Sequence, residues 1–176
     1  AVPAGLETFG WAARPELSCD ENALDFALLL ARSSNCRGGS MGCLLSTSTG
    51  DVFSCATNSP ITPTDAKKPS SDLHAEVNAI GRCARLGIAT EGCTAYITMP
   101  PCKKCTGVLV ASGVRRIVTR KKFCEQDERE LLPQLKRLGI PFDVVGDTEA
   151  RRTNLDRLAS KRKRPPDMEV PSGPAS

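Results

Sequence analysis

Apolar and polar residues follow two different periods along the chain, and these periods predict a series of helices and strands. From residue 20 onward, apolar residues recur at helical spacing at Ala23, Phe26, Ala27 and Leu30, which predicts a first helix with Asp20 as its N-cap. The stretch "RGGS" at 37–40 ends this helix. Two short apolar runs follow, "MGCLLST" and "DVFSCAT", and "STG" at 48–50 separates them, which predicts a hairpin.

A polar segment and a second helix come next. Residues 58–72 contain three prolines and are predicted to form a loop without regular structure. Ser71 or Asp72 is expected to cap the helix that follows, and Gly87 is expected to end it. The apolar face of this helix is predicted to consist of Ala75, Ala79, Ile80, Cys83 and Leu86.

Strands and helices continue to alternate in the second half of the chain. "TAYITM", "RRIVTR" and "PFDVV" are predicted to be strands. Pro101 is expected in the first turn of a helix between the first two strands, where a missing N–H costs nothing. Residues 124–139 form a charged amphipathic pattern with Pro133 as the point where this helix can kink, and 147–162 predict a last helix. This alternation predicts an α/β sandwich in which helices cover a mixed sheet.

Length and composition indicate one domain with short flanking segments. A chain of 176 residues is long enough for one well-packed core. Residues 1–18 are predicted to be loosely ordered, and the domain is predicted to span residues 19–162. Residues 163–176 are first basic and then rich in proline and serine, which is typical of a disordered tail.

Composition also limits the compartment and the partners. The longest apolar run, 26–31, is far too short to cross a bilayer, and "AVPAGLETFG" is unlike a secretory signal, so no membrane partner is expected. An odd number of cysteines, nine, argues against a disulfide framework and favours the cytoplasm or the nucleus. The net charge of +4 neither requires nor excludes a nucleic-acid partner.

The candidate chemistry lies at the only histidine and at one pair of cysteines. Cys102 and Cys105 are three residues apart at a predicted helix start, where amide dipoles favour thiolates, and His74 also stands near a helix start. Two thiolates and one imidazole suit Zn²⁺ and leave a fourth position for water. Glu76, two residues after His74, is a candidate proton carrier. These groups together predict hydrolytic deamination of an amidine-like ring carbon.

Each half of this pattern is weak when it stands by itself. A C-x-x-C pair also occurs in redox sites and in structural zinc sites, and an H-x-E triplet occurs by chance. A structural zinc would need a fourth ligand, and the other seven cysteines have no partner at ligand spacing, so we expect them to be small buried residues. The order H-x-E followed by P-C-x-x-C is the signature of zinc nucleobase deaminases.

The stretches "HAEVNAI" and "AYITMPPCKKC" resemble the zinc motifs of the cytidine and deoxycytidylate deaminase superfamily, and the closest resemblance is to its deoxycytidylate (dCMP) branch. "ASGVRRIV" and "LKRLGIPFDVV" extend the resemblance, which covers about residues 21–146. It implies a three-layer α/β/α sandwich with a five-stranded mixed sheet, usually in a homo-oligomer. It also implies that His74, Cys102 and Cys105 bind zinc, that Glu76 carries the proton, and that Asn58 holds a sugar hydroxyl of a pyrimidine nucleotide.

Three functions are compatible with these observations. The first is deamination of a free cytosine nucleotide, with dCMP as the first choice. The second is deamination of a base within RNA or single-stranded DNA, gripped by the basic stretch "RRTNLDRLASKRKR" at 151–164, although this stretch is also typical of a nuclear localisation signal or a solvated helix end. Few aromatic residues are available for base stacking, which weakens this second function. The third is a non-catalytic subunit that binds zinc only for folding, and the presence of Glu76 argues against it.

Overall fold

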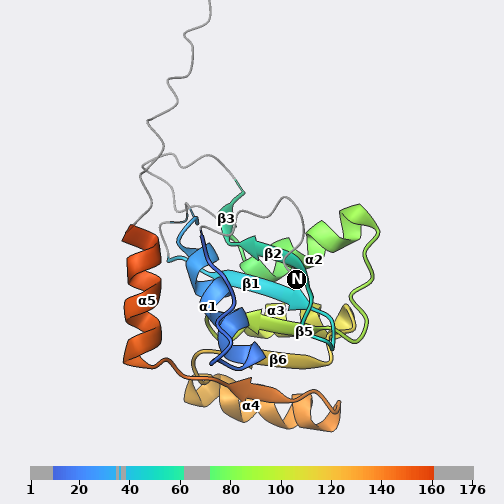
Figure 1. The fold of residues 1–176 in the computed structure, drawn as a ribbon. Helices are drawn as coiled ribbons and strands as arrows, with labels where there is room; N and C mark the ends of the chain where they lie inside the picture. Colours follow the sequence, from blue (N-terminus) through green and yellow to red (C-terminus); the bar gives the residue numbers. More distant parts are fainter. Residues whose placement is uncertain (1–9, 35, 37–38, 62–71, 161–176) are drawn as a thin grey trace, which may run out of the picture.

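A five-stranded mixed sheet forms the centre of the molecule (Figure 1). The computed structural model describes residues 10–34, 36, 39–61 and 72–160. The strands lie in the order β2, β1, β5, β6, β7, with bounds Val52–Thr57, Gly42–Ser46, Thr94–Ile97, Arg116–Thr119 and Phe142–Val144. β1 runs antiparallel to both β2 and β5, whereas β6 and β7 run parallel to β5. The predicted mixed sheet is therefore confirmed.

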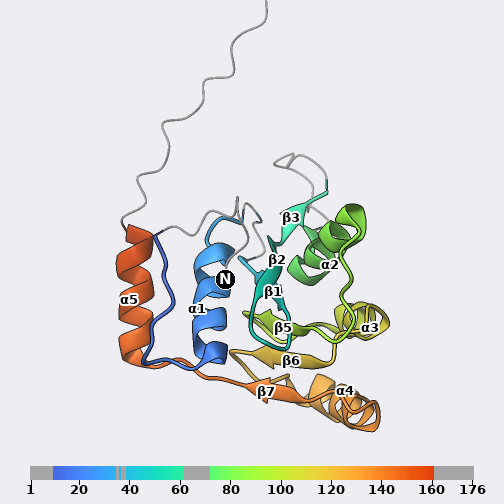
Figure 2. The same cartoon turned by 45° about the vertical axis from the view of Figure 1, so that its right-hand side comes forward.

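Helices cover both faces of this sheet (Figure 2). The five helices of the described chain are α1 Cys19–Ala31, α2 Ala75–Leu86, α3 Lys103–Ala111, α4 Glu125–Arg137 and α5 Glu149–Ser160. α1 lies on one face and α5 packs beside it, while α2, α3 and α4 lie on the other face. The arrangement confirms the predicted three-layer α/β/α sandwich.

Alternation along the strands divides the core between the two faces. In β1, Cys43 and Leu45 pack against α2, α3 and α4, whereas Leu44 between them packs against α1. β6 repeats the pattern, with Ile117 on the first face and Val118 on the second. Period-two alternation places successive side chains on opposite faces. A strand that is apolar at every position is therefore buried on both sides.

The first helix begins two residues earlier than the sequence pattern indicated. Ser18 is the N-cap, and its hydroxyl accepts a hydrogen bond from the Glu21 N–H at 3.2 Å while the Glu21 carboxylate accepts one from the Ser18 N–H at 2.9 Å. This reciprocal pair is a capping box. The expectation that Asp20 caps the helix was wrong, because Asp20 lies in the first turn and its carboxylate pairs with Arg116.

The predicted hairpin is confirmed, whereas the loop after it holds more structure than expected. β1 and β2 pair antiparallel, with Gly42 opposite Thr57. At the two ends of the 58–72 segment, β3 (Ser59–Pro60) pairs antiparallel with β4 (Asp72–Leu73). These two-residue strands are too short for a periodic sequence pattern to mark them. Residues 62–71, between the two strands, lie outside the described residues.

Buried ion pairs attach α5 to α1. The guanidinium of Arg151 is 1% exposed and donates to the Asp25 carboxylate at 2.7 and 3.0 Å. Arg120 of the segment after β6 contacts the same carboxylate and that of Asp147. Arg151 is therefore not a solvent-exposed member of the basic stretch at 151–164, whereas its neighbour Arg152 is exposed. Residues 161–164, the "KRKR" end of this basic stretch, lie outside the described residues.

The flanking segments are described in part. Residues 10–18 contain neither helix nor strand, yet Trp11 stacks on Phe26 of α1 with ring centroids 4.9 Å apart. The proposed boundaries at residues 18 and 162 stay predictions. Within the described residues, the longest helices are 13 residues, and none has the length and apolar character that a bilayer crossing requires.

Candidate metal centre

Two helix starts place the candidate metal ligands side by side. His74 is the N-cap residue of α2, and Cys102 is the N-cap residue of α3. Neither side chain makes a capping hydrogen bond to its own helix, so both are available for another partner. The expected cap at Ser71 or Asp72 was therefore wrong, and so was the expected place of Pro101 inside the helix. Pro101 precedes the N-cap of α3, where its fixed φ shapes the approach to Cys102.

The three side chains meet at ligand distances. The Nδ1 atom of His74 lies 3.3 Å from the Sγ atom of Cys105 and 3.8 Å from that of Cys102, and the three ligand atoms lie within 4.8 Å of one another. Zinc bonds of about 2.3 Å to sulfur and 2.1 Å to nitrogen in a tetrahedral arrangement would place sulfur and nitrogen about 3.6 Å apart. The observed pairs bracket that value, so this donor set fits a zinc ion.

The thiol of Cys105 is buried, and its surroundings oppose ionisation. Burial raises the pKa of Cys105 well above its ordinary value, and the Glu76 carboxylate and the Cys102 sulfur raise it further. The amide dipoles at the start of α3 act in the opposite direction, because they favour a thiolate. A cation between the sulfurs would supply the opposite charge that this site needs.

Glu76 is directed into the same site. It lies in the first turn of α2, is 5% exposed and interacts with the Cys105 thiol. Burial is the main cause that raises the pKa of Glu76 above 4.5, while a hydrogen bond from its own backbone, the charge of His74 and the Cys105 thiol act against it. A buried carboxyl group beside a candidate metal centre has the chemistry to accept and return a proton.

A cavity of about 190 Å³ opens beside these residues. Met41, Ile97 and Met99 form its apolar wall, and its lining also includes Gly39, Asn58, Asp72, His74, Glu76, Pro100 and Cys102. Within the part of the chain that the structure describes, no lysine or arginine lines this cavity. The cavity therefore combines an apolar slot with a few polar groups, as small-molecule sites do.

Asn58 lines this cavity, but most of its amide is already engaged by the protein. Its Oδ1 atom accepts hydrogen bonds from the Met41 N–H at 2.8 Å and from the Ser34 hydroxyl at 2.7 Å, and its Nδ2 atom donates to the Gly39 carbonyl at 2.8 Å. Sequence reasoning identified Asn58 and missed Ser34. A serine after a helix is common, so the sequence carries no signal for this contact.

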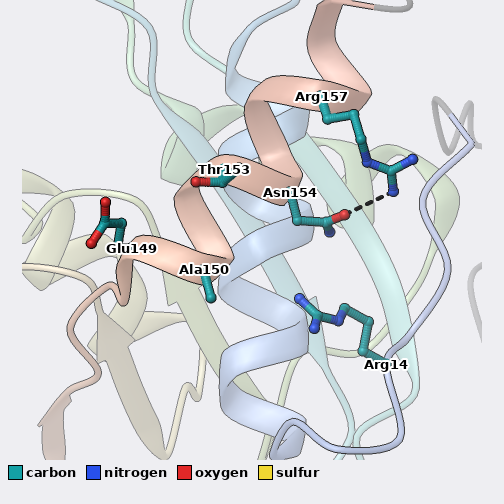
Figure 3. A pocket seen from close by; sticks show the side chains of 6 residues that line it. All are labelled: Arg14, Glu149, Ala150, Thr153, Asn154 and Arg157. Carbon is teal, nitrogen blue, oxygen red and sulfur yellow. Dashed lines mark hydrogen bonds between the residues drawn. The ribbon is translucent and has the colours of Figure 1, made fainter.

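A second, larger cavity of about 940 Å³ lies at α5, away from these residues (Figure 3). Its lining consists of Arg14, Glu149, Ala150, Thr153, Asn154 and Arg157. The two arginines of this lining have partners within the protein, because Arg14 pairs with Glu16 and Arg157 donates to Asn154 at 3.0 Å. The larger cavity is therefore not the candidate site. The smaller cavity is the candidate, because the metal-binding donor atoms lie beside it.

Residues 17–121, more than half of the chain, match the family model described as the cytidine and deoxycytidylate deaminase zinc-binding region. This protein belongs to the cytidine and deoxycytidylate deaminase family. The matched region includes His74, Glu76, Cys102 and Cys105, so the family's zinc-binding region coincides with the site that the structure brings together.

Similar proteins agree with the family and differ in substrate. The deoxycytidylate deaminase of Enterobacteria phage T2 is 40% identical over 55 residues, which are 31% of this chain and 27% of the phage protein. The cytosine deaminase of Candida albicans is 34% identical over 101 residues, which are 56% of this chain and 64% of the yeast protein. Both alignments thus cover less than two thirds of the relative's length.

The fold also matches a solved structure. The dCMP deaminase of cyanophage S-TIM5, crystallised with dCMP and dUMP, superimposes with a TM-score of 0.60. The sequences are 23% identical, and the match covers 76% of this chain and all of the phage chain. At this level of identity, the likeness concerns the fold.

Proposed function

We propose that this protein is a zinc-dependent hydrolytic deaminase that converts a cytosine nucleotide, with dCMP as the first choice, to the uracil nucleotide and ammonia. One observation carries the proposal. Two thiols and one imidazole converge beside a small cavity that His74 and Cys102 line, and the buried carboxyl group of Glu76 lines the same cavity. A structural zinc site has no use for an adjacent buried carboxylate, whereas a hydrolytic site requires a proton carrier.

His74, Cys102 and Cys105 would hold the ion. When bound, a zinc ion supplies one chemistry here, which is to lower the pKa of water to about 7. The cavity beside the three ligands leaves room for a substrate to approach from one side. Met41, Ile97 and Met99 would pack against the flat faces of a pyrimidine ring and exclude bulk water.

Glu76 would move the protons. Its carboxylate takes a proton from the attacking water and delivers it to the ring nitrogen next to the carbon under attack, as the new carbon–oxygen bond forms. The hydroxyl group now on that carbon gives up a second proton, which passes through the same carboxylate to the exocyclic amine. The carbon–nitrogen bond breaks, and ammonia leaves while the carbon keeps its new oxygen as a carbonyl.

The lining of the cavity bears on whether the substrate carries a phosphate. The described lining contains no cation that would pair with a phosphate, and Arg37, Lys67 and Lys68 lie outside the described residues. Free cytosine and its nucleosides are therefore the second candidate substrates, and the longer alignment with a cytosine deaminase supports them. We expect a homo-oligomer from the family resemblance.

Deamination of a polynucleotide stays the alternative. Its support was the basic stretch at 151–164, and burial of Arg151 removes one cation from that stretch. A non-catalytic role is disfavoured because Glu76 is buried in the site rather than replaced.

The deciding experiment measures zinc content and ammonia release together. The wild-type protein should hold about one zinc per chain and release ammonia from dCMP, deoxycytidine or cytosine. Glu76→Gln should keep the zinc and the fold, while its activity falls roughly 10²–10⁴-fold because only proton transfer is lost. His74→Ala should lose the zinc.

Glu128→Gln is the matched control, because this glutamate is exposed on α4. It should retain both zinc and activity. Zinc-free, well-folded wild-type protein would contradict the proposal, and so would near-normal activity of Glu76→Gln. Ammonia release from tRNA or single-stranded DNA with none from the small substrates would favour the polynucleotide alternative.

A further inference from the structure

The orientation of the Asn58 amide is fixed by main-chain groups. The Met41 N–H can only donate, and it lies 2.8 Å from Oδ1. The Gly39 carbonyl can only accept, and it lies 2.8 Å from Nδ2. Rotating the amide by half a turn would place a donor against a donor and an acceptor against an acceptor. Asn58 is therefore held in one orientation at the wall of the cavity.

Ser34 fills the remaining acceptor position of this amide. The Ser34 hydroxyl oxygen accepts a hydrogen bond from the Cys36 N–H at 3.2 Å, so its own hydrogen is free to point toward Asn58. The Asn58 Oδ1 atom lies 2.7 Å away, closer than the Asn58 carbonyl oxygen at 3.0 Å. An amide oxygen has two lone pairs, and Met41 and Ser34 together use both.

One N–H of the Asn58 side-chain amide then remains without a partner among the described residues. The Nδ2 atom carries two hydrogens, Gly39 accepts one, and the second has no partner among the described residues. Asn58 is 6% exposed and lines the cavity that also contains His74 and Glu76. A buried donor without a partner is costly, and a ligand that accepts a hydrogen bond removes that cost.

From these contacts we propose that Ser34 is a positioning residue, which saturates the acceptor side of Asn58 so that Asn58 presents one N–H donor and no acceptor to the substrate. This inference rests on the proposed function. It assigns the group that Asn58 recognises as an oxygen that accepts a hydrogen bond. It also refines the expectation that Asn58 holds a sugar hydroxyl, because the amide could then only donate to that oxygen.

Two kinds of oxygen in a cytosine nucleoside fit this description. The first kind is an oxygen of the sugar, and the second is the carbonyl oxygen of the base. Free cytosine has only the second, whereas deoxycytidine and dCMP have both. Comparing the three substrates therefore identifies which oxygen meets Asn58.

The test is a set of single-hydroxyl substitutions. Ser34→Ala should raise KM about three- to tenfold and change kcat less than about twofold, because Ser34 orients a binding group and touches no reacting atom. Ser34→Thr keeps a hydroxyl and should restore KM. Ser33→Ala is the matched control, since the exposed Ser33 hydroxyl donates to the Leu30 carbonyl rather than to Asn58, and its KM should stay unchanged.

A double-mutant cycle separates positioning from a general effect on folding. If Ser34 acts through Asn58, Ser34→Ala should have almost no further effect on KM in an Asn58→Ala background. An equal effect in both backgrounds would overturn the proposal, and so would an unchanged KM for Ser34→Ala. A Ser34→Ala effect with free cytosine assigns the base carbonyl as the partner, and an effect confined to deoxycytidine and dCMP assigns the sugar oxygen.

A second readout is independent of catalysis. In the substrate-free protein, the two Asn58 side-chain amide protons should give separate, slowly exchanging NMR signals that shift and exchange faster in Ser34→Ala but not in Ser33→Ala. Unchanged signals would overturn the link between Ser34 and Asn58 even in an active enzyme. If wild-type protein deaminates none of the substrates, the proposed function fails, and these signals still decide the contact.

Discussion

At the residue scale, the carboxylate of Asp20 joins three elements of the fold. The Arg116 guanidinium of β6 donates to both of its oxygens, at 2.8 and 2.7 Å, and the Tyr96 hydroxyl of β5 donates to one at 2.8 Å. The hydrogen bonds from Arg116 are the main cause that holds the pKa of Asp20 below 3.8. Burial is the main cause that raises the pKa of Tyr96 to about 12, and the hydrogen bond to Asp20 is the second cause. This hydroxyl therefore stays a donor throughout the neutral range.

This depressed pKa predicts a pH dependence of stability. Because the folded pKa of Asp20 lies below the unfolded value of about 3.9, the unfolded chain takes up the proton first on acidification. The stabilisation is complete well above pH 4 and is lost as the pH falls through the folded pKa. Asp20→Asn should therefore lower the free energy of unfolding by about 1–2 kcal/mol at pH 7, and the difference from wild type should shrink below about pH 4.

Urea unfolding of both proteins between pH 2.5 and 7 measures this difference. Asp156→Asn serves as the comparison, because that carboxylate is 71% exposed in its pair with Arg32 and its loss should cost less than about 1 kcal/mol. A difference between wild type and Asp20→Asn that stays constant from pH 7 to pH 2.5 would contradict the argument.

Residue identity and spacing were sufficient to predict the candidate metal centre. His74, Glu76, Cys102 and Cys105 were recognisable because metal and proton chemistry require particular side chains at particular intervals. The supporting contacts were not recognisable, since Ser34 and Asn58 are 24 residues apart and their approach depends on how α1 meets β1. A serine and an asparagine are also common turn residues, and their identities carry little information without coordinates.

At the element scale, periodicity predicted the main helices and strands but not how each begins. The capping box at 18–21 is present in the sequence as Ser-x-x-Glu, two residues before the alternative cap at Asp20. Leu86 was assigned to a buried helix face, but it is the last residue of α2 and is 60% exposed. Helix ends depend on local side-chain contacts and on the neighbouring element, which a periodic pattern does not contain.

The contact between α1 and β1 depends on one glycine. A Cβ atom at Gly42 would lie 2.2 Å from the carbonyl oxygen of Ala27, which belongs to the backbone of α1 and cannot move independently. Gly42→Ala should therefore push α1 away from the sheet and lower the free energy of unfolding by about 1–3 kcal/mol. Guanidinium unfolding monitored by circular dichroism measures this change.

Gly107→Ala is the matched control for that substitution. Gly107 lies within α3, and a Cβ there would meet no atom within 4 Å. Alanine is the better helix former, so this variant should gain up to about 1 kcal/mol. If Gly42→Ala were as stable as Gly107→Ala, the close approach of α1 to β1 would not be the reason for glycine at position 42.

At the scale of the whole molecule, the two faces of the sheet have separate tasks. α2 and α3 hold the candidate metal centre on one face, whereas α1 and α5 complete the other. The layers were predictable from alternating strands and helices. The ion pair between α5 and α1 was not predictable, because the sequence around Arg151 is highly charged, which is typical of a solvated surface.

The neighbouring residues Arg151 and Arg152 test this view of the second face. Arg151 is 1% exposed against Asp25, which is 2% exposed, while Arg152 is exposed. Without Arg151, the buried Asp25 carboxylate keeps only the more distant Arg120 guanidinium at 3.7 Å. Arg151→Met should therefore lower the free energy of unfolding by about 3 kcal/mol, the lower end of the range for a broken buried pair. Arg152→Met should change it by less than about 0.5 kcal/mol.

Both variants lose one positive charge, so a general electrostatic effect would lower their stability equally. That outcome in urea unfolding would contradict the role of the buried pair. Because α5 lies across the sheet from the candidate metal centre, KM and kcat of the folded fraction should be the same in both variants.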